Sequence, residues 1–301
     1  MKPDPLASAI EASIAAATQE RFVLLDRAPV GGGCIHEAMR LDGRAGDATR
    51  TYFAKTNESA SAPLFEAEAD GLAALRESGC VRVPGVVERG DEGEHAWLVL
   101  EWLELVPLAG PSAARLGEEL ARQHAAPRQR FGWERDNFIG SSPQRNGWCD
   151  DWIGFWQERR LQPQLRMAAR NRLPSRMIDR GERLMADCAL FFSGYTPQPS
   201  LLHGDLWSGN AAALADGTPV VFDPAVYVGD READVAMTEL FGGFPADCLA
   251  RYREASPLHD GYRARRDLYN LYHRLNHANL FAGGYVRDSE VSIERLLAEL
   301  G

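Results

Sequence analysis

The sequence predicts an α+β fold with two lobes: a small N-terminal lobe built on a five-stranded antiparallel sheet with one main helix, and a larger, mostly helical C-terminal lobe. Short apolar runs of strand type fill much of the first hundred residues, and helical periodicity dominates the remainder. A chain of 301 residues is also too long for one small core. We therefore expect an N-terminal lobe of residues 1–103 and a C-terminal lobe of residues 104–301.

The N-terminal lobe contains five strand-like runs and one amphipathic helix. The helix covers residues 64–77, where Leu64, Leu72 and Leu75 recur at helical spacing. The strands are expected at 22–25, 34–39, 51–56, 85–87 and 96–100. Because these runs follow one another along the chain, an antiparallel arrangement is expected.

Helical patterns dominate the C-terminal lobe. They cover residues 113–124, 152–161, 177–192, 262–281 and 289–300, and the third is apolar enough to be the central helix. The polar-tipped side chains of 262–281 are expected to pack in the core with their hydrogen bonds satisfied. Residues 131–146 instead form a long polar loop with embedded aromatic residues. Loops of this length tend to be functional, although a plain surface excursion also fits.

Charge and composition exclude several classes of protein. The net charge of −10 argues against a general nucleic-acid binder, because such binding relies on clustered Lys and Arg. No stretch approaches the roughly 18 uninterrupted apolar residues of a membrane span, so we expect no membrane partner and a cytoplasmic protein. Five widely spaced cysteines without a Cys-x-x-Cys pair argue against structural disulfides and against a zinc knuckle.

Two acidic residues and an asparagine follow two strand-like runs. The segment HGDLWSGN occupies 203–210, and Asp223 follows the apolar run 219–222. The spacing of Asp205 and Asn210, Asp-x-x-x-x-Asn, is typical of a kinase catalytic loop. We expect Asp205 to accept or orient the proton of a substrate hydroxyl, and Asn210 and Asp223 to hold Mg²⁺ against the phosphates of ATP.

Residues near this loop are expected to support it. His203 is more suited to bracing the loop than to reacting. Asp230 or Asp234, at the start of a predicted helix, could cap and support the loop from behind.

A lysine and a glutamate complete the predicted nucleotide site. Lys55 ends the strand at 51–56, and Glu68 lies on the otherwise apolar stripe of the helix at 64–77. A carboxylate on such a stripe needs a partner, and Lys55 is the nearest candidate. In kinases this pair positions the lysine on nucleotide phosphates. Glu66 is the competing residue but falls off the stripe, and a solvated edge charge is the alternative for Lys55.

Two further segments are candidates for nucleotide contacts. Gly31, Gly32 and Gly33 lie between two strands, where backbone N–H groups could approach phosphate oxygens, although a plain turn fits as well. The backbone of Glu101 and Leu103, between the lobes, could hydrogen-bond an adenine edge, or the segment could be a simple linker.

Several motifs together resemble fructosamine-3-kinase and its bacterial ketosamine-3-kinase relatives. The resemblance runs from about residue 31 to about residue 285, and it would place the chain in the protein-kinase-like fold with aminoglycoside phosphotransferases and choline kinases. The motifs are HGDLWSGN at 203–210, DPA at 223–225, GDREAD at 229–234, LFGGF at 240–244, LYHRLNH at 271–277, FG at 131–132, DNFIG at 136–140, Gln144 with Asn146, and ERRL at 158–161.

The resemblance implies transfer of the ATP γ-phosphate to the 3-hydroxyl of a ketosamine, either a small molecule or a glycated protein lysine. The phosphorylated adduct would then decompose and free the amine, which makes the expected activity a deglycation. Trp207, Asn137 and Gln144 are the expected substrate-binding residues. Trp207 stands where many protein kinases carry a lysine, and its indole suits a sugar ring or an alkyl-amine stem.

The sequence is also compatible with other functions. Another small-molecule kinase of the same fold could act on an aminoglycoside, choline or homoserine, and a nucleotide-binding relative could lack catalysis. Cys34, directly after the glycines, could form an intermolecular disulfide, so we expect either a monomer or a redox-sensitive homodimer.

Overall fold

The computed structural model describes residues 4–31 and 35–301, which form two compact units. The first unit holds the chain up to Pro107 together with Ala212–Asp223, and the second holds Leu108–Ala211 and Pro224–Gly301. The boundary expected after residue 103 did not anticipate the return of residues 212–223 to the first unit.

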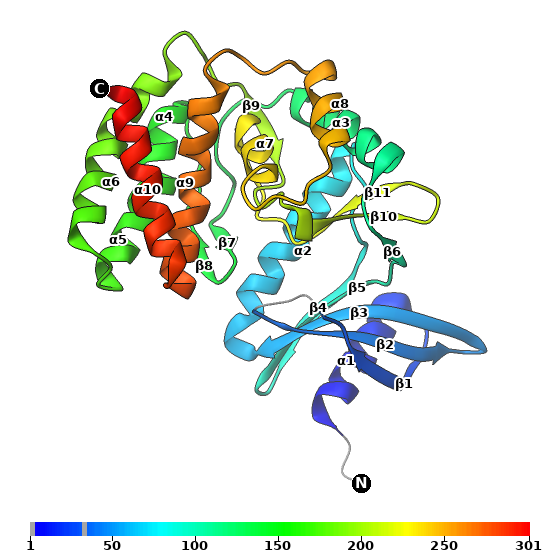
Figure 1. Cartoon of the computed structure of the whole chain (residues 1–301). Helices are drawn as coiled ribbons and strands as arrows, with labels where there is room; N and C mark the ends of the chain where they lie inside the picture. Colours follow the sequence, from blue (N-terminus) through cyan, green and yellow to red (C-terminus); the bar gives the residue numbers. More distant parts are fainter. Residues whose placement is uncertain (1–3, 32–34) are drawn as a thin grey trace. The chain divides into compact units, whose positions relative to one another are not determined.

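The first unit is built on a five-stranded antiparallel sheet, as predicted (Figure 1). Its strands lie in the order β1-β2-β3-β5-β4. Their bounds are β1 Phe22–Pro29, β2 Glu37–Ala45, β3 Ala48–Glu58, β4 Val86–Glu92 and β5 His95–Glu101. The second strand begins later and runs further than the predicted 34–39, because β2 pairs with β3 along its whole length down to a tight turn between Ala45 and Ala48.

Helices pack on both faces of this sheet. Helix α1 (Pro5–Thr18) buries Ile10 and Ile14 in a core that includes Ala54 of β3. Because side chains alternate along a strand, the next residue, Lys55, points to the opposite face. There it meets helix α2 (Ala62–Ser78), which confirms the helix predicted at 64–77.

A short second sheet explains why residues 212–223 belong to the first unit. Strands β6 (Leu105–Val106), β10 (Ala211–Leu214) and β11 (Pro219–Val221) lie in the order β11-β10-β6. The N–H of Val221 also donates to the carbonyl of Arg82 at 3.0 Å. The hydrogen bonds of this sheet and the bond from Val221 to Arg82 attach residues 212–223 to the first unit.

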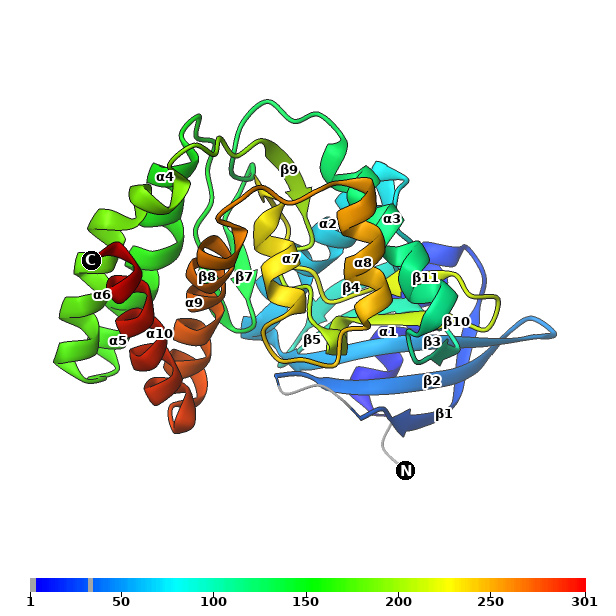
Figure 2. The same ribbon diagram turned by 45° about the horizontal axis from the view of Figure 1, so that its top comes forward.

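The second unit is mainly helical. Helices α5, α6, α9 and α10 lie side by side in both views of the ribbon (Figures 1 and 2). The helices are α3 Gly110–Ala125, α4 Trp152–Phe155, α5 Gln162–Arg170, α6 Ser175–Asp187, α7 Glu232–Thr238, α8 Ala246–Ala255, α9 Tyr262–Phe281 and α10 Gly284–Leu300, with a π-helical turn at Trp156–Leu161. Two pairs of short strands complete the unit: β7 Asn137–Ile139 with β8 Ser142–Gln144, and β9 Pro199–Leu202 with β12 Tyr227–Asp230.

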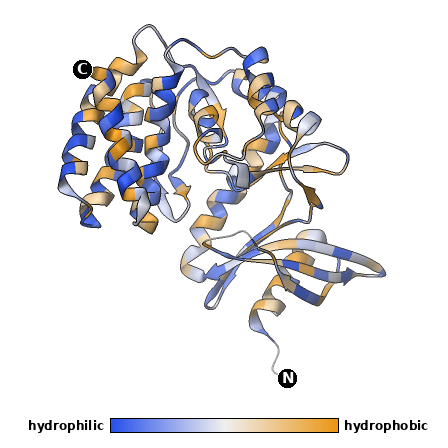
Figure 3. Ribbon diagram, in the orientation of Figure 1, coloured by the Kyte–Doolittle hydropathy of each residue, from blue (hydrophilic) through white to orange (hydrophobic). Residues whose placement is uncertain are grey.

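Helix α9, rather than residues 177–192, is the central helix of this unit. The α-helix at 177–192 ends at Asp187, continues as a 3-10 turn, and buries only Met177, Gly181 and Leu184 in its α-helical part. Helix α9 has the predicted bounds and buries ten residues along 265–278, because α5, α7 and α10 all pack against it. Hydrophilic and hydrophobic residues accordingly alternate along these helices (Figure 3). None of the helices in the described part of the chain has the length and apolar character needed to cross a membrane.

Candidate active site

Lys55 lies between two carboxylates in the first unit. Its Nζ is 2.7 Å from Oε1 of Glu68 and 2.6 Å from Oδ1 of Asp223. The predicted pairing of Lys55 with Glu68 is therefore present, and the strand-edge alternative is wrong because Lys55 is buried. The competing residue, Glu66, instead pairs with Arg89 at 3.6 Å on the surface.

The charges of this cluster depend on one another. Burial opposes the positive charge of Lys55, but the carboxylates of Asp223 and Glu68 outweigh it and raise the lysine pKa. Burial, together with the nearby carboxylate of Asp223, raises the pKa of Glu68 despite its bond to Lys55. Lys55 is thus a fixed cation, and Glu68 is the group that holds it in place.

His36 lies beside this cluster where a kinase glycine loop would carry its third glycine. Its Nδ1 is 2.9 Å from Nδ2 of Asn57, and its ring packs on Phe65 at 4.7 Å between centroids. Burial and the charge of Lys55 lower the pKa of His36 to about 4, so the ring is neutral at pH 7. Of the expected loop, Gly31 is described, whereas Gly32, Gly33 and Cys34 lie outside the described residues.

The segment expected to bind adenine follows β5. The backbone N–H of Glu101 donates to the carbonyl of Gly85 at 2.8 Å, so an adenine contact by this residue would have to use its carbonyl. The carboxylate of Glu101 accepts from Arg82 and from the N–H of Gly85, which fixes the end of the strand. Leu103 is half-buried two residues later.

The loop that carries Asp205 is held from behind by Asp234 of α7. The carboxylate of Asp234 accepts from the backbone N–H of His203 at 2.7 Å and of Gly204 at 2.9 Å. Gly204 has φ +82°, and a Cβ there would lie 2.0 Å from the carbonyl oxygen of Ala225, so only glycine fits. The sequence left Asp230 and Asp234 as alternatives for this support, and the structure gives it to Asp234.

Asp234 is itself held by a buried histidine. Its carboxylate lies 3.2 Å from Nε2 of His124, whose Nδ1 is 2.9 Å from the hydroxyl of Tyr252. Burial by itself would raise the pKa of Asp234, but the hydrogen bonds from His124 and from the backbone outweigh burial and lower it. Asp234 is therefore a carboxylate at neutral pH and a strong acceptor for the loop. His124 carried no signal in the sequence, because its partner is 110 residues away.

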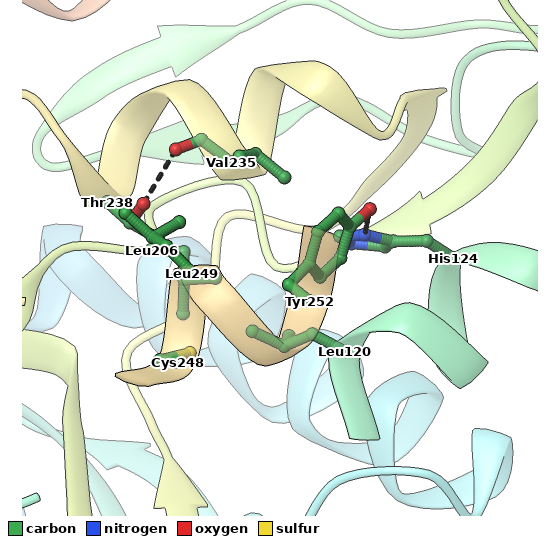
Figure 4. Close-up of a pocket in the computed structure, with 8 residues that line it drawn as sticks. All are labelled: Leu120, His124, Leu206, Val235, Thr238, Cys248, Leu249 and Tyr252. Atoms are coloured by element: carbon green, nitrogen blue, oxygen red, sulfur yellow. Dashed lines mark hydrogen bonds between the residues drawn. The ribbon is translucent and has the colours of Figure 1, made fainter. Parts of the chain in front are cut away.

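Close packing continues behind Leu206, the buried residue after Asp205. A cavity of about 10 Å³ remains there, near the lower limit for one water molecule. Figure 4 shows its lining residues: Leu120, His124, Leu206, Val235, Thr238, Cys248, Leu249 and Tyr252. Since the loop is packed and hydrogen-bonded on this side, its backbone has little freedom to move.

Asp205 and Asn210 lie close together within the loop. Nδ2 of Asn210 donates to the carbonyl of Asp205 at 2.9 Å and to its Oδ2 at 3.2 Å. The N–H of Asp205 donates to Nδ1 of His203 at 3.3 Å, so His203 braces the loop as expected. These bonds orient the Asp205 carboxylate.

The donor chemistry fits Mg²⁺. Asn210 supplies an amide oxygen and Asp223 a carboxylate whose side chain is 44% exposed, and both are hard oxygen donors. Within the described ranges no group of three or more His, Cys, Asp or Glu could hold a metal by itself.

Trp207 differs from its neighbours in the loop because its side chain faces outward. It is 36% exposed, whereas Leu206 is buried. The indole lies over Gly209, where a Cβ would come within 2.3 Å of the ring. Its edge meets Phe241 with the ring centroids 5.9 Å apart. An exposed aromatic side chain therefore lies two residues after Asp205 in the loop.

Asn137 and Gln144 are interior residues, contrary to the expectation that they bind substrate. Nδ2 of Asn137 donates to the carbonyl of Val226 at 2.7 Å, and Gln144 bonds Asn137, the carbonyl of Ala225 and the hydroxyl of Tyr272. Both side chains are buried and lie on the hairpin of β7 and β8. Their amide groups donate to backbone carbonyls that would otherwise lack a hydrogen-bond donor. Asn137 and Gln144 therefore hold the backbone of Ala225 and Val226, which leads into β12.

The sequence also missed Arg160, which is fully buried in the π-helical turn. It donates to the carbonyl of Arg145 at 2.5 Å and to Asn146 at 2.9 Å, and its guanidinium lies 4.0 Å from the centroid of the Tyr227 ring. Arginine is rarely buried, so its position in an aromatic and basic segment gave no hint of this role.

Comparison with known proteins decides the family. The model of the fructosamine kinase family matches residues 6–299. The chain belongs to this family. It is 42% identical over 96% of both chains to a protein of Synechocystis sp. named "probable ketoamine kinase". It is also 42% identical to the chloroplastic protein-ribulosamine 3-kinase of Arabidopsis thaliana, over 88% of this chain and 80% of that one.

A solved structure supports the same assignment. A crystal structure from Haemophilus somnus 129PT, named as a candidate fructosamine-3-kinase, matches with a TM-score of 0.87 and 30% identity over 96% of each chain. The predicted protein-kinase-like α+β fold is therefore confirmed.

Proposed function

We propose that this protein is an ATP-dependent ketosamine 3-kinase. The observation that carries the proposal is the cluster of Lys55, Glu68 and Asp223, which unites the charged groups that phosphoryl transfer needs on the nucleotide side. Asp205, which accepts a hydrogen bond from Asn210, supplies the carboxylate needed on the acceptor side. Membership of the fructosamine kinase family supports a ketosamine as the acceptor.

Each residue has a defined task in this reaction. The oxygen of the substrate 3-hydroxyl attacks the γ-phosphorus, its proton passes to the carboxylate of Asp205, and the bond from the γ-phosphorus to the bridging oxygen of ADP breaks. Lys55, held by Glu68, binds phosphate oxygens. Asn210 and Asp223 would hold Mg²⁺, which when bound neutralises charge on the phosphates.

Trp207 is the residue we assign to the sugar or the amine stem of the substrate. Its flat apolar face with one N–H donor suits a polyol chain with C–H groups on one side. The 3-phosphorylated product is expected to decompose and release the free amine, so the activity is a deglycation.

A panel of acceptors tests the proposal. Purified protein with ATP and Mg²⁺ should consume ATP with ribulosyl-lysine or fructosyl-lysine, and not with choline, homoserine or an aminoglycoside. The Asp205→Asn variant serves as the blank for contaminating kinases. Consumption with choline or an aminoglycoside and with neither ketosamine would overturn the proposal.

We also propose that Cys34 controls the assembly state by forming an intermolecular disulfide. Burial makes two of the other cysteines, Cys188 and Cys248, unreactive by raising the pKa of each thiol to about 12, whereas Cys80 and Cys149 are half-buried. Electrophoresis without reductant after mild oxidation should show a dimer that Cys34→Ser abolishes. A monomer under these conditions would remove the idea.

A further inference from the structure

A continuous line of aromatic side chains leads away from the catalytic loop in the second unit. It begins at Trp207, continues to Phe241 at 5.9 Å and to His277 at 4.9 Å, and then reaches both Phe281 at 5.6 Å and Tyr285 at 5.0 Å, all between ring centroids. Phe281 and Tyr285 also contact each other at 6.2 Å. We call these five residues the aromatic path.

The aromatic path is unusually exposed. Trp207 is 36%, Phe241 41% and Phe281 50% exposed, although large aromatic side chains usually gain most from burial. A run of neighbouring exposed rings in a soluble protein commonly marks a binding surface. Because the run starts at Trp207, two residues after Asp205 in the same loop, the binding partner is expected to be the substrate.

The backbone holds this surface in place. The hydroxyl of Ser208 donates to the carbonyl of Gly242 at 3.0 Å, which ties the segment carrying Phe241 to the catalytic loop. Gly242 and Gly243 have φ +73° and +78°, a conformation that favours glycine. At the far end, Ala282 adopts φ +53° in the turn between α9 and α10, which brings Phe281 beside Tyr285. Non-glycine residues adopt such angles at an energetic cost.

The charge of His277 suits a cationic ligand. Its Nδ1 lies 2.8 Å from the carbonyl of His273, so Nδ1 carries the proton and donates. Burial lowers the pKa of His277, which leaves the ring neutral at pH 7 despite that hydrogen bond. A neutral ring among aromatic faces attracts an ammonium group, because the faces of aromatic rings are negative.

We propose that the aromatic path binds the amine side of the ketosamine, and that Phe281 and Tyr285 contact the peptide residues flanking a glycated lysine. This inference rests on the proposed function. In a ketosamine only C2 and C1 separate the reacting C3 from the amine nitrogen, so a sugar whose 3-hydroxyl reaches Asp205 places its secondary ammonium near Trp207 and Phe241. The lysine side chain and its neighbours must then continue beyond Phe241.

The extent of the aromatic path favours a polypeptide over a small amine. A short acyclic sugar and its amine would occupy Trp207 and Phe241 and leave the last two rings unused. Apolar residues beside a glycated lysine would cover Phe281 and Tyr285. Aromatic anchors of this kind commonly dominate the affinity of a peptide surface.

Two substrates separate the two ends of the aromatic path. One is a short peptide with a single ribulosyl-lysine flanked by leucines, and the other is ribulosyl-methylamine. In Phe281→Ala and Tyr285→Ala, kcat/KM for the peptide should fall about tenfold, while kcat/KM for ribulosyl-methylamine should change by less than about twofold. The matched control is Val291→Ala. Val291 is an apolar residue of α10 that is 47% exposed, close to the 50% of Phe281, and it is not part of the aromatic path.

The outcomes are distinct. Equal losses on both substrates, or no loss on the peptide, would overturn the inference while leaving the proposed function intact. Phosphorylation of neither substrate by the unaltered protein would overturn both. If Phe281→Ala converts a dimer to a monomer in sedimentation and the substrate ratio is unchanged, the aromatic path is a contact between two copies and the inference is wrong.

Discussion

Lys55 in the first unit and Asp205 in the second are held in place by different kinds of contact. Lys55 is fixed by Glu68 and Asp223, charged groups that themselves belong to the proposed nucleotide site. The loop that carries Asp205 is fixed by Asp234, which accepts from the backbone N–H groups of His203 and Gly204 and is itself held by the buried His124. Around Lys55, the side chains that hold the lysine are also the ones proposed to act on the nucleotide. Around Asp205, the side chains that hold the loop are different from the one proposed to react.

This difference predicts how substitutions act. A change in the first cluster alters charge and therefore nucleotide binding. A change behind the catalytic loop alters the shape of the loop, and it affects stability as well as turnover. Substitutions matched in size and charge can test whether the first cluster affects nucleotide binding and the residues behind the loop affect stability and turnover.

The largest effect is expected for Asp205→Asn. Turnover should fall by at least about a hundredfold, because general base catalysis contributes about 10²–10⁴-fold. The Kd of a nucleotide analogue, measured by calorimetry, should stay within about twofold, since no nucleotide contact is removed. Turnover above a tenth of the unaltered enzyme would remove Asp205 from the catalytic role.

Asp234→Asn should mainly destabilise the second unit. The amide cannot accept both backbone N–H groups and the bond from His124, and breaking such a buried charged network costs about 3–5 kcal/mol. The urea midpoint should fall, and the control Asp288→Asn, an exposed residue of α10, should leave it unchanged.

The pH dependence of this loss has a defined sign. The folded pKa of Asp234 lies below its unfolded value, so its contribution is fully present above the unfolded pKa of about 3.9 and is lost as pH falls through the folded pKa. The gap in unfolding free energy between the unaltered protein and Asp234→Asn should therefore be constant above about pH 5 and shrink in acid. A gap that widens in acid would contradict the assignment.

Glu68→Gln should act on the nucleotide side with a smaller effect. Lys55 keeps Asp223 but loses the partner that fixes its orientation, so kcat/KM for ATP should fall about tenfold, and the KM for the ketosamine should hardly change. Glu66→Gln removes an equal charge two residues away, where the carboxylate pairs with Arg89 at the surface, and should have no measurable effect. Equal losses in both variants would show that overall charge, rather than the Lys55 pair, is responsible.

The smallest effect is expected for Ser208→Ala. The variant loses one hydrogen bond to Gly242, worth about 0.5–1.5 kcal/mol, so kcat/KM for a ketosamine should fall by less than about tenfold. The KM for ATP should not change. A change confined to ATP would contradict the link between the catalytic loop and the aromatic path.

The two regions also differ in how far the sequence revealed them. The Lys55–Glu68 pair could be predicted because a lone carboxylate on an apolar helix stripe requires a cation, and the periodicity of α2 was clear. The spacing of Asp205 and Asn210 likewise follows a local pattern. The five strands and the bounds of α9 could be predicted from local patterns for the same reason.

The support of the catalytic loop could be predicted only in part. Asp234 was one of two candidates, and the structure was needed to choose between it and Asp230. His124 and Arg160 act through partners far away in the sequence, and local patterns carry no information on such pairs. Asn137 and Gln144 were expected to bind substrate but lie in the interior. The sequence of a polar loop with aromatic residues is the same whether its polar side chains face a substrate or bond to backbone groups inside the protein.

The most direct test of the proposed reaction is a phosphorus NMR spectrum of the product formed from ribulosyl-lysine, ATP and Mg²⁺. We predict a new phosphate monoester coupled to the proton on C3, which is absent with Asp205→Asn and decays as free lysine appears. A monoester on any other carbon, or ATP consumed without a sugar phosphate, would contradict it.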